Sequence, residues 1–211
     1  LLAQKGEITP GSMISILRHH ADEGKADWSP DEGITGADVC MHAGWGPIRG
    51  SQSTGSMVSQ LDRSDTVHWV TGTSAPCTSL FKPVWMDCGL PECGPSPDGT
   101  YDETTLYWRH ETIHREILRN YSEIIKLIKP EQQNYEEDML KEVAENLTAS
   151  FNRRNTISVK YFDQAFQLES GWLTSVKSHS GKGTGGFLYK TAWKKFNAQA
   201  GMKLNGISGR D

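Results

Sequence analysis

The pattern of hydrophobic and polar positions divides the chain into a strand-rich first half and a helical second half. β-Type residues concentrate in residues 52–61, 66–71 and 79–86, and residues 37–43 (ADVCMHA) alternate in a similar way. The connections between these runs are short, which suits antiparallel strands and leaves no room for parallel crossovers. We therefore expect four consecutive antiparallel strands within residues 36–86.

The longest helix is expected after these strands, over residues 102–128. Its apolar stripe recurs at spacings of three, four and seven: Leu106, Ile113, Ile117, Tyr121, Ile124 and Ile128. Pro130 lacks a backbone N–H, so we expect it to end this helix and to separate it from a second one over residues 131–151.

A shorter helix is expected near the N-terminus. Thr9 is a typical N-cap residue, Pro10 suits the first helical position, and the apolar positions run to about Ala21. His19 and His20 lie at the end of this helix, where positive charge is favourable. We interpret the two histidines as capping or solvated residues.

Residues 151–211 are expected to form a helical, basic tail behind a main domain of residues 1–150. Helices over residues 156–178 and 187–200 would flank a glycine-rich joint at residues 180–186 (SGKGTGG). The last 35 residues hold six Lys and one Arg against one Asp, although the whole chain has a net charge of −4.

Composition narrows the class of protein. The 211 residues are 36% hydrophobic, which allows a substantial core, and no run approaches the roughly 18 apolar residues of a membrane span. Net negative charge argues against nucleic acid as the main partner. Cys40 and Cys77 are interpreted as buried free thiols, whereas Cys88 and Cys93 could form a small loop disulfide. The cysteines and the rest of the sequence leave the cellular compartment open.

Two motifs carry candidate chemistry. The first is His110-Glu111-Thr112-Ile113-His114, a formal HExxH in which two histidines share a helix face and Glu136 could be a third zinc ligand. His110 also falls within the apolar stripe of its helix, which favours packing over coordination. We expect no metal and no cofactor, and keep a zinc metalloprotease as the lesser alternative.

The second motif is the polar turn over residues 71–79 (TGTSAPCTS), which lies between strands that carry His68 and Phe81. The pattern is compatible with an elaborate hairpin and with the rim of a pocket for a polar ligand.

Several segments together resemble the C-terminal half of the secernin and C69 dipeptidase family of N-terminal-nucleophile hydrolases. The resemblance covers roughly residues 10–128 and is carried by GSMISILRHH, DVCMHA, STGSMVSQL, HWVTGTSAPCTSLFKPV and LYWRHE. It implies an α+β fold, part of an αββα sandwich with an antiparallel meander and long helices. In that family the LYWRHE-like helix has no zinc role.

The resemblance also implies a cysteine-type hydrolase of dipeptides or other short peptides. Its nucleophile would be an N-terminal Cys whose own α-amino group acts as the base. That Cys and the oxyanion-forming Asn would lie in the family's first half, and no residue of this chain carries either role. We therefore expect the chain alone to be inactive, and to need the N-terminal half of the enzyme or a second processed chain.

Candidate residues for the substrate pocket are His68, Thr71 and Thr73, with Lys82 as a partner for a peptide carboxylate. A homo-oligomer is left open. The main alternative is a non-catalytic, secernin-like interaction protein, since eukaryotic secernins are associated with exocytosis.

Overall fold

The computed structural model describes residues 5–20, 28–32, 38–45, 48–61, 66–179 and 183–203. Five helices and one small sheet make up the described fold, which is of the α+β class. The helices are α1 (Pro10–Leu17), α2 (Leu106–Ile117), α3 (Tyr121–Glu145), α4 (Phe151–His179) and α5 (Phe187–Gln199).

The sheet is an antiparallel meander in the order β1-β2-β3. The strands are β1 (Met57–Gln60), β2 (Val67–Val70) and β3 (Lys82–Val84). Val58 pairs with Trp69 and Ser59 pairs with His68, so consecutive residues of β1 point to opposite faces. The predicted antiparallel order is confirmed for these three strands.

The prediction of a fourth strand over residues 37–43 is wrong for the described residues, 38–43, which form no strand. This segment bends at Val39 and Cys40 and has no ladder partner. A single backbone bond joins it to the next segment, from the Ser53 N–H to the Met41 carbonyl over 2.9 Å. Its alternating pattern instead directs two side chains, Cys40 and His42, into a buried polar cluster.

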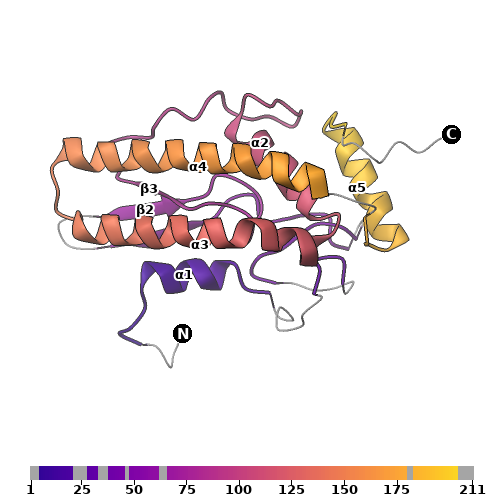
Figure 1. Ribbon diagram of the computed structural model, residues 1–211, viewed down its shortest axis with the longest axis horizontal. Helices are drawn as coiled ribbons and strands as arrows, with labels where there is room; N and C mark the ends of the chain where they lie inside the picture. The colour runs from indigo at the N-terminus through magenta and orange to yellow at the C-terminus, as the bar shows by residue number, and fades with distance from the viewer. Residues whose placement is uncertain are drawn as a thin grey trace.

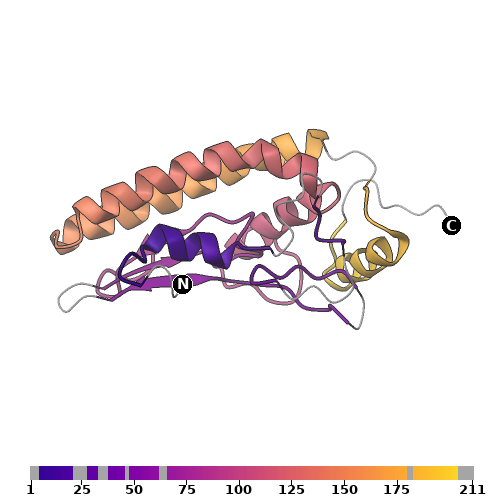
Figure 2. The same ribbon diagram turned by 90° about the horizontal axis from the view of Figure 1, so that it is seen from below.

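Helices α1 and α3 lie on one side of the sheet, and the long helix α4 runs beside α3. In Figure 1 the long helices α3 and α4 run side by side with α1 below them, and in Figure 2 the strands form the opposite border of the molecule. The face toward the helices is apolar and buried, with Val58 6% and Trp69 1% exposed. On the other face Met57 is 62% exposed, and Val70 is half-buried. Burial of the helix-facing side supplies most of the sheet's stabilisation.

The single helix expected over residues 102–128 is in fact two. The chain leaves the helical conformation at Asn120, and the preceding carbonyl, of Arg119, accepts a hydrogen bond from the Thr184 N–H over 2.8 Å. The Arg119 carbonyl at the break is therefore bonded to a distant segment. The apolar periodicity of the sequence cannot predict such a break, because it reports only on contacts along one helix face.

The prediction that Pro130 ends a helix is also wrong, because α3 continues through this residue. Pro130 is exposed, and a buried stripe runs along α3 on both sides of it: Ile124, Ile128, Tyr135, Met139 and Val143. Packing of this stripe offsets the hydrogen bond that proline cannot donate.

The start of α1 follows the sequence prediction. Thr9 is the N-cap, and its side chain exchanges hydrogen bonds with Ser12 in a capping box. The helix ends at Leu17, earlier than expected, and Ala21 lies outside the described residues.

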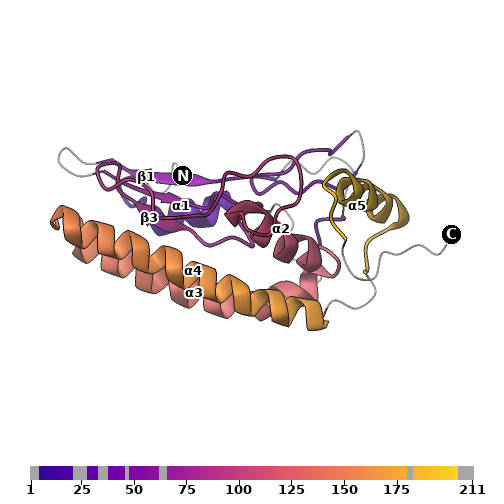
Figure 3. The same ribbon diagram turned by 90° about the horizontal axis from the view of Figure 1, so that it is seen from above.

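The C-terminal helices agree with the expected helical tail. α4 begins at Phe151 and packs against α2, α3 and β3, while α5 lies at one end of the molecule (Figure 3). Of the glycine-rich joint, residues 183–186 are described. Within the described part of the chain, no helix is long and apolar enough to cross a membrane.

Candidate metal centre and adjacent pocket

Two histidines and two cysteines from three separate segments meet in the interior. His20 follows α1, Cys40 and His42 lie in the segment 38–43, and Cys77 lies between β2 and β3. All four are buried, with exposed fractions from 0% to 3%.

The chain brings these side chains together through local geometry. Cys40 and His42 are two residues apart, and Sγ of Cys40 lies 3.6 Å from Nε2 of His42. His20 leaves the end of α1 and stacks on Trp28, with the ring centroids 4.1 Å apart.

Arg18, at the end of α1, binds the turn that contains Cys77. Its Nε donates to the Pro76 carbonyl over 2.7 Å and its Nη2 donates to the Ser79 carbonyl over 2.8 Å. The same guanidinium makes a bidentate ion pair with Glu136 of α3. Cys77 is thereby held opposite the segment that follows α1.

The four side chains converge on His42. Its Nε2 atom lies 3.2 Å from Nε2 of His20, 3.6 Å from Sγ of Cys40 and 3.3 Å from Sγ of Cys77. One ligand atom from each of the four residues lies within 4.8 Å of all the others. Two thiols and two imidazoles are the donors of common structural zinc sites.

The other ring nitrogen of His42 begins a chain of polar contacts. Its Nδ1 lies 3.2 Å from Nε2 of His114, and Nδ1 of His114 lies 3.2 Å from Oε2 of Glu111. Oε1 of Glu111 accepts from Nε of Arg115 over 2.7 Å. If Nδ1 of each histidine carries the proton, every contact in this chain has one donor and one acceptor, and Nε2 of His42 faces the cysteines with its lone pair.

The pKa values of the clustered groups shift in different directions. Burial lowers the pKa of His42, and burial raises the pKa of the Cys40 thiol. Burial alone would raise the pKa of Cys77 as well, but the hydrogen bond from Cys40 and the charge of His42 outweigh it, and its pKa falls well below the usual value. The cluster therefore favours a thiolate at Cys77.

Glu111 is held ionised beneath the cluster. Burial would raise the pKa of this carboxyl, but the charges and hydrogen bonds of His114 and Arg115 lower it to about 2. Glu111 thus serves as a fixed negative charge at the end of the histidine chain.

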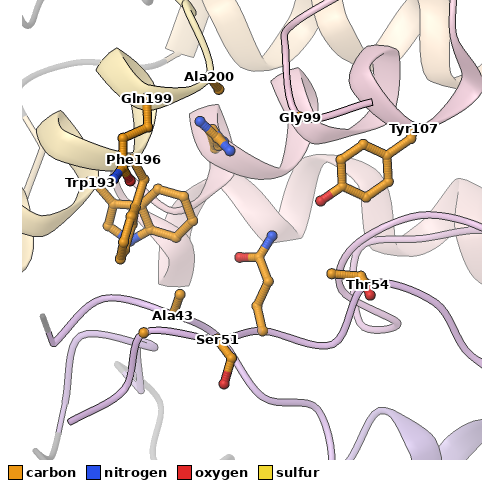
Figure 4. A pocket seen from close by; sticks show the side chains of 12 residues that line it. Ala43, Ser51, Thr54, Gly99, Tyr107, Trp193, Phe196, Gln199 and Ala200 are labelled. Atoms are coloured by element: carbon orange, nitrogen blue, oxygen red, sulfur yellow. The ribbon is translucent and has the colours of Figure 1, made fainter. Parts of the chain in front are cut away.

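An open pocket of about 340 Å³ lies beside Arg115. Figure 4 shows Tyr107 on one side and the aromatic rings of Trp193 and Phe196 on the other, with Ser51 on the segment beneath them. The pocket therefore joins α2, α5 and the segment before β1.

Arg115 is fixed in the wall of this pocket. Its Nη1 donates to Oδ1 of Asn197 over 2.7 Å, and its guanidinium carbon lies 5.5 Å and 5.3 Å from the ring centroids of Trp108 and Trp193. Nη2 makes no hydrogen bond to the protein groups that the structure describes. A guanidinium placed in this way can bind a carboxylate with little loss of side-chain entropy.

Gln52 also lines the pocket. It donates through Nε2 to Oε1 of Glu111 over 3.1 Å, and its Oε1 is buried without a hydrogen-bond partner among the described residues. The pocket thus combines a cationic donor with aromatic walls, as small-molecule sites commonly do.

The residues predicted to line a substrate pocket lie elsewhere in the fold than the pocket beside Arg115. Thr71, Thr73 and Lys82 are 0%, 0% and 1% exposed, and none of them lines the pocket beside Arg115. Burial lowers the pKa of Lys82, whose Nζ donates to the carbonyls of Thr71 and Leu80 over 2.8 Å each.

The two threonines complete the same buried hydrogen-bond network. Oγ1 of Thr71 accepts from the Ser56 N–H over 2.9 Å, and Oγ1 of Thr73 donates to Oγ of Ser79 over 2.9 Å. The polar turn therefore forms a buried hydrogen-bond network. His68 is half-buried and bonds to Ser59 over 2.8 Å, on the sheet face away from the helices.

The HExxH residues do not converge on one point. His110 contacts Glu169 over 2.8 Å and the hydroxyl groups of Thr78 and Ser79 over 3.2 Å each. Glu136 is the ion-pair partner of Arg18, and His114 contacts the buried cluster. The motif marks two internal networks of the fold, and the three groups are not positioned as one ligand set.

Sequence reasoning missed the Cys and His cluster. The sequence favours a capping or solvated role for His20 and buried free thiols at Cys40 and Cys77. The Cys-x-His spacing at Cys40 and His42 was the available signal, but the other two donors come from distant segments. Cys88 and Cys93, considered as a disulfide, are free thiols in the structure.

Comparison with protein-family models, curated proteins and solved structures finds no match to this chain.

Proposed function

We propose that this chain is the C-terminal portion of a cysteine-type N-terminal-nucleophile hydrolase that cleaves dipeptides or other short peptides. In this proposal the chain supplies sheet scaffold and a substrate pocket, and the nucleophilic Cys comes from the N-terminal half of the enzyme. The pocket is the one beside Arg115, which replaces the site expected around the polar turn.

The observation that carries the proposal is the guanidinium in the pocket wall. Arg115 is anchored by Glu111 and Asn197, and stacks near two tryptophan rings, so its position is fixed before a ligand arrives. A short peptide carries a terminal carboxylate that Arg115 can bind and side chains that suit aromatic walls.

The sheet gives independent support. In an αββα sandwich, each sheet has helices on one face and the second sheet on the other. Here α1 and α3 lie on one side of the sheet. On the opposite face Met57 of β1 is exposed, whereas Lys82 of β3 is buried and its Nζ lies 5.8 Å from the ring centroid of Phe162 in α4. We propose that the second sheet, from the N-terminal half, covers the exposed part of this face, with Met57 and His68.

A binding experiment tests the pocket. The chain is titrated with a dipeptide and with the same dipeptide as its C-terminal amide, and heats or NMR shifts are recorded. We expect the amide to bind about tenfold or more weakly, because it lacks the charge that pairs with Arg115. Equal affinity for the two ligands, or binding of neither, would contradict the assignment of the pocket.

A reconstitution experiment tests the chemistry. The chain is coexpressed with an N-terminal half that begins at its Cys, and dipeptide turnover is measured before and after thiol alkylation. We expect turnover that alkylation abolishes, and none from the chain alone. Peptide binding without turnover in the assembled protein would favour the non-catalytic interaction protein.

A further inference from the structure

We propose that this chain holds one zinc ion in a closed site made by two imidazoles and two thiolates: His20, Cys40, His42 and Cys77. The proposal is independent of the hydrolase assignment, because it rests on the buried cluster and not on the pocket.

The spacing of the donor atoms matches a tetrahedron of zinc ligands. With Zn–N of about 2.0–2.1 Å and Zn–S of about 2.3 Å, the edges are roughly 3.3 Å for N–N, 3.6 Å for N–S and 3.8 Å for S–S. The N–N contact between His20 and His42 is 3.2 Å, and the N–S contacts of His42 are 3.3 Å and 3.6 Å. All donor atoms lie within 4.8 Å of one another, so a central ion would be within reach of each.

Hydrogen bonding alone does not account for the arrangement. Nε2 of an imidazole has either one proton or one lone pair, so it can make one good hydrogen bond within the plane of the ring. Nε2 of His42 has three polar neighbours at close range, and Nδ1 of the same ring is already engaged by His114. Convergence of several donors on one small volume is what a metal ion requires.

The donor types select the metal. Thiolate and imidazole ligands in a four-coordinate set favour zinc over calcium or magnesium, which prefer oxygen. Four protein ligands leave no open position for water or substrate. The inferred zinc is therefore structural, and the chemistry of the proposed hydrolase does not pass through it.

The surroundings orient one ligand in the way that metal sites require. A metal-bound histidine usually donates its second N–H to an acceptor that fixes the ring. Nδ1 of His42 has His114 as that acceptor, and the ionised Glu111 in turn accepts from His114. A buried carboxylate at the end of the chain favours positive charge at the cluster.

A zinc ion here would join segments that regular secondary structure does not join. It would tie His20, shortly after α1, to the segment 38–43 and to the turn before β3. Because the ligands come from distant parts of the chain, binding would stabilise the folded state over the unfolded one.

A metal-binding experiment on the full chain tests the proposed site directly. It is purified without chelator, equilibrated with Zn²⁺, desalted and assayed for metal, and a second sample is loaded with Co²⁺ and examined by absorption spectroscopy. We expect one zinc per chain, and a cobalt spectrum with thiolate charge-transfer bands and the intense d–d bands of tetrahedral coordination. Cys77→Ser should lose stoichiometric zinc, and Cys88→Ser, the matched control outside the cluster, should retain it.

Each outcome decides the question. A folded wild-type chain that retains no zinc, or whose cobalt complex lacks thiolate bands, would overturn the proposal. Full retention of zinc by folded Cys77→Ser would overturn the assigned ligand set. If that variant does not fold, the wild-type metal content and cobalt spectrum still test the site.

Discussion

Nδ1 of His42 lies 3.2 Å from Nε2 of His114, and this contact links the buried cluster to helix α2. His114 belongs to the HExxH motif, yet its role in the structure is to position another histidine. Removing its acceptor nitrogen separates this role from direct coordination.

Replacing His114 by Phe should lower zinc affinity about 10- to 100-fold, while leaving all four proposed ligands in place. The phenylalanine ring fills much of the same buried volume but cannot accept a hydrogen bond from Nδ1 of His42. Competition with a chromophoric chelator measures the affinity, and His179→Phe, on the exposed end of α4, is the control. Unchanged zinc affinity in a folded His114→Phe chain would show that the contact does not orient the ligand.

Replacing Arg115 by Met should weaken dipeptide binding roughly 10- to 100-fold, because a charged hydrogen bond is worth about 1.5–3 kcal/mol. Arg153→Met removes the same charge from a partly exposed site on α4 and should bind the dipeptide normally. Calorimetric titration of the two variants gives the comparison. Equal losses in both would point to general electrostatics and not to the pocket.

The buried pair of His110 and Glu169 predicts a pH dependence of stability. Burial would raise the pKa of Glu169, but the imidazole of His110, 2.8 Å away, outweighs it and holds the pKa below its ordinary 4.5. Because the folded-state pKa is depressed, the pair stabilises the fold above the unfolded pKa and loses this contribution as pH falls through the folded pKa.

Glu169→Gln should therefore lower the free energy of unfolding by about 1–3 kcal/mol near neutral pH, with the difference from wild type shrinking below pH of about 4.5. Urea unfolding at a series of pH values measures this difference, and the exposed Glu145→Gln is the control. A difference that grows as the pH falls would contradict the assigned charge state.

Replacing Pro130 by Ala should stabilise the chain by about 1–3 kcal/mol, since it restores a helical N–H inside α3 and removes a steric conflict. The lost rigidity of the unfolded chain reduces the gain somewhat. Thermal and urea unfolding measure it, with Lys126→Ala, whose ion pair is largely exposed, as a control expected to change little. Destabilisation by Pro130→Ala would argue that α3 is not continuous at this position.

Local signals in the sequence predicted local structure well. The hydroxyl of Thr9 and the fixed backbone of Pro10 define the start of α1, and alternation around Val58 and Trp69 defines two strands that pair. These features depend on neighbours along the chain or on one short turn.

Structural features that depend on contacts between distant parts of the chain could not be predicted from the sequence. The break before α3 coincides with a bond from Thr184 to Arg119, and Pro130 is tolerated because buried residues lie on both sides of it in α3. The Cys and His cluster likewise depends on three segments meeting, so His20 resembled a helix cap and Cys77 a lone thiol. The polar turn was recognised as unusual, but sequence could not tell its buried network from a pocket rim.

X-ray absorption at the zinc edge of the loaded full chain tests the central structural claim most directly. We expect one zinc per chain with a first coordination shell of two sulfur atoms at about 2.3 Å and two nitrogen atoms at about 2.0–2.1 Å. A shell of oxygen and nitrogen alone, or zinc well below one per chain after equilibration, would contradict it.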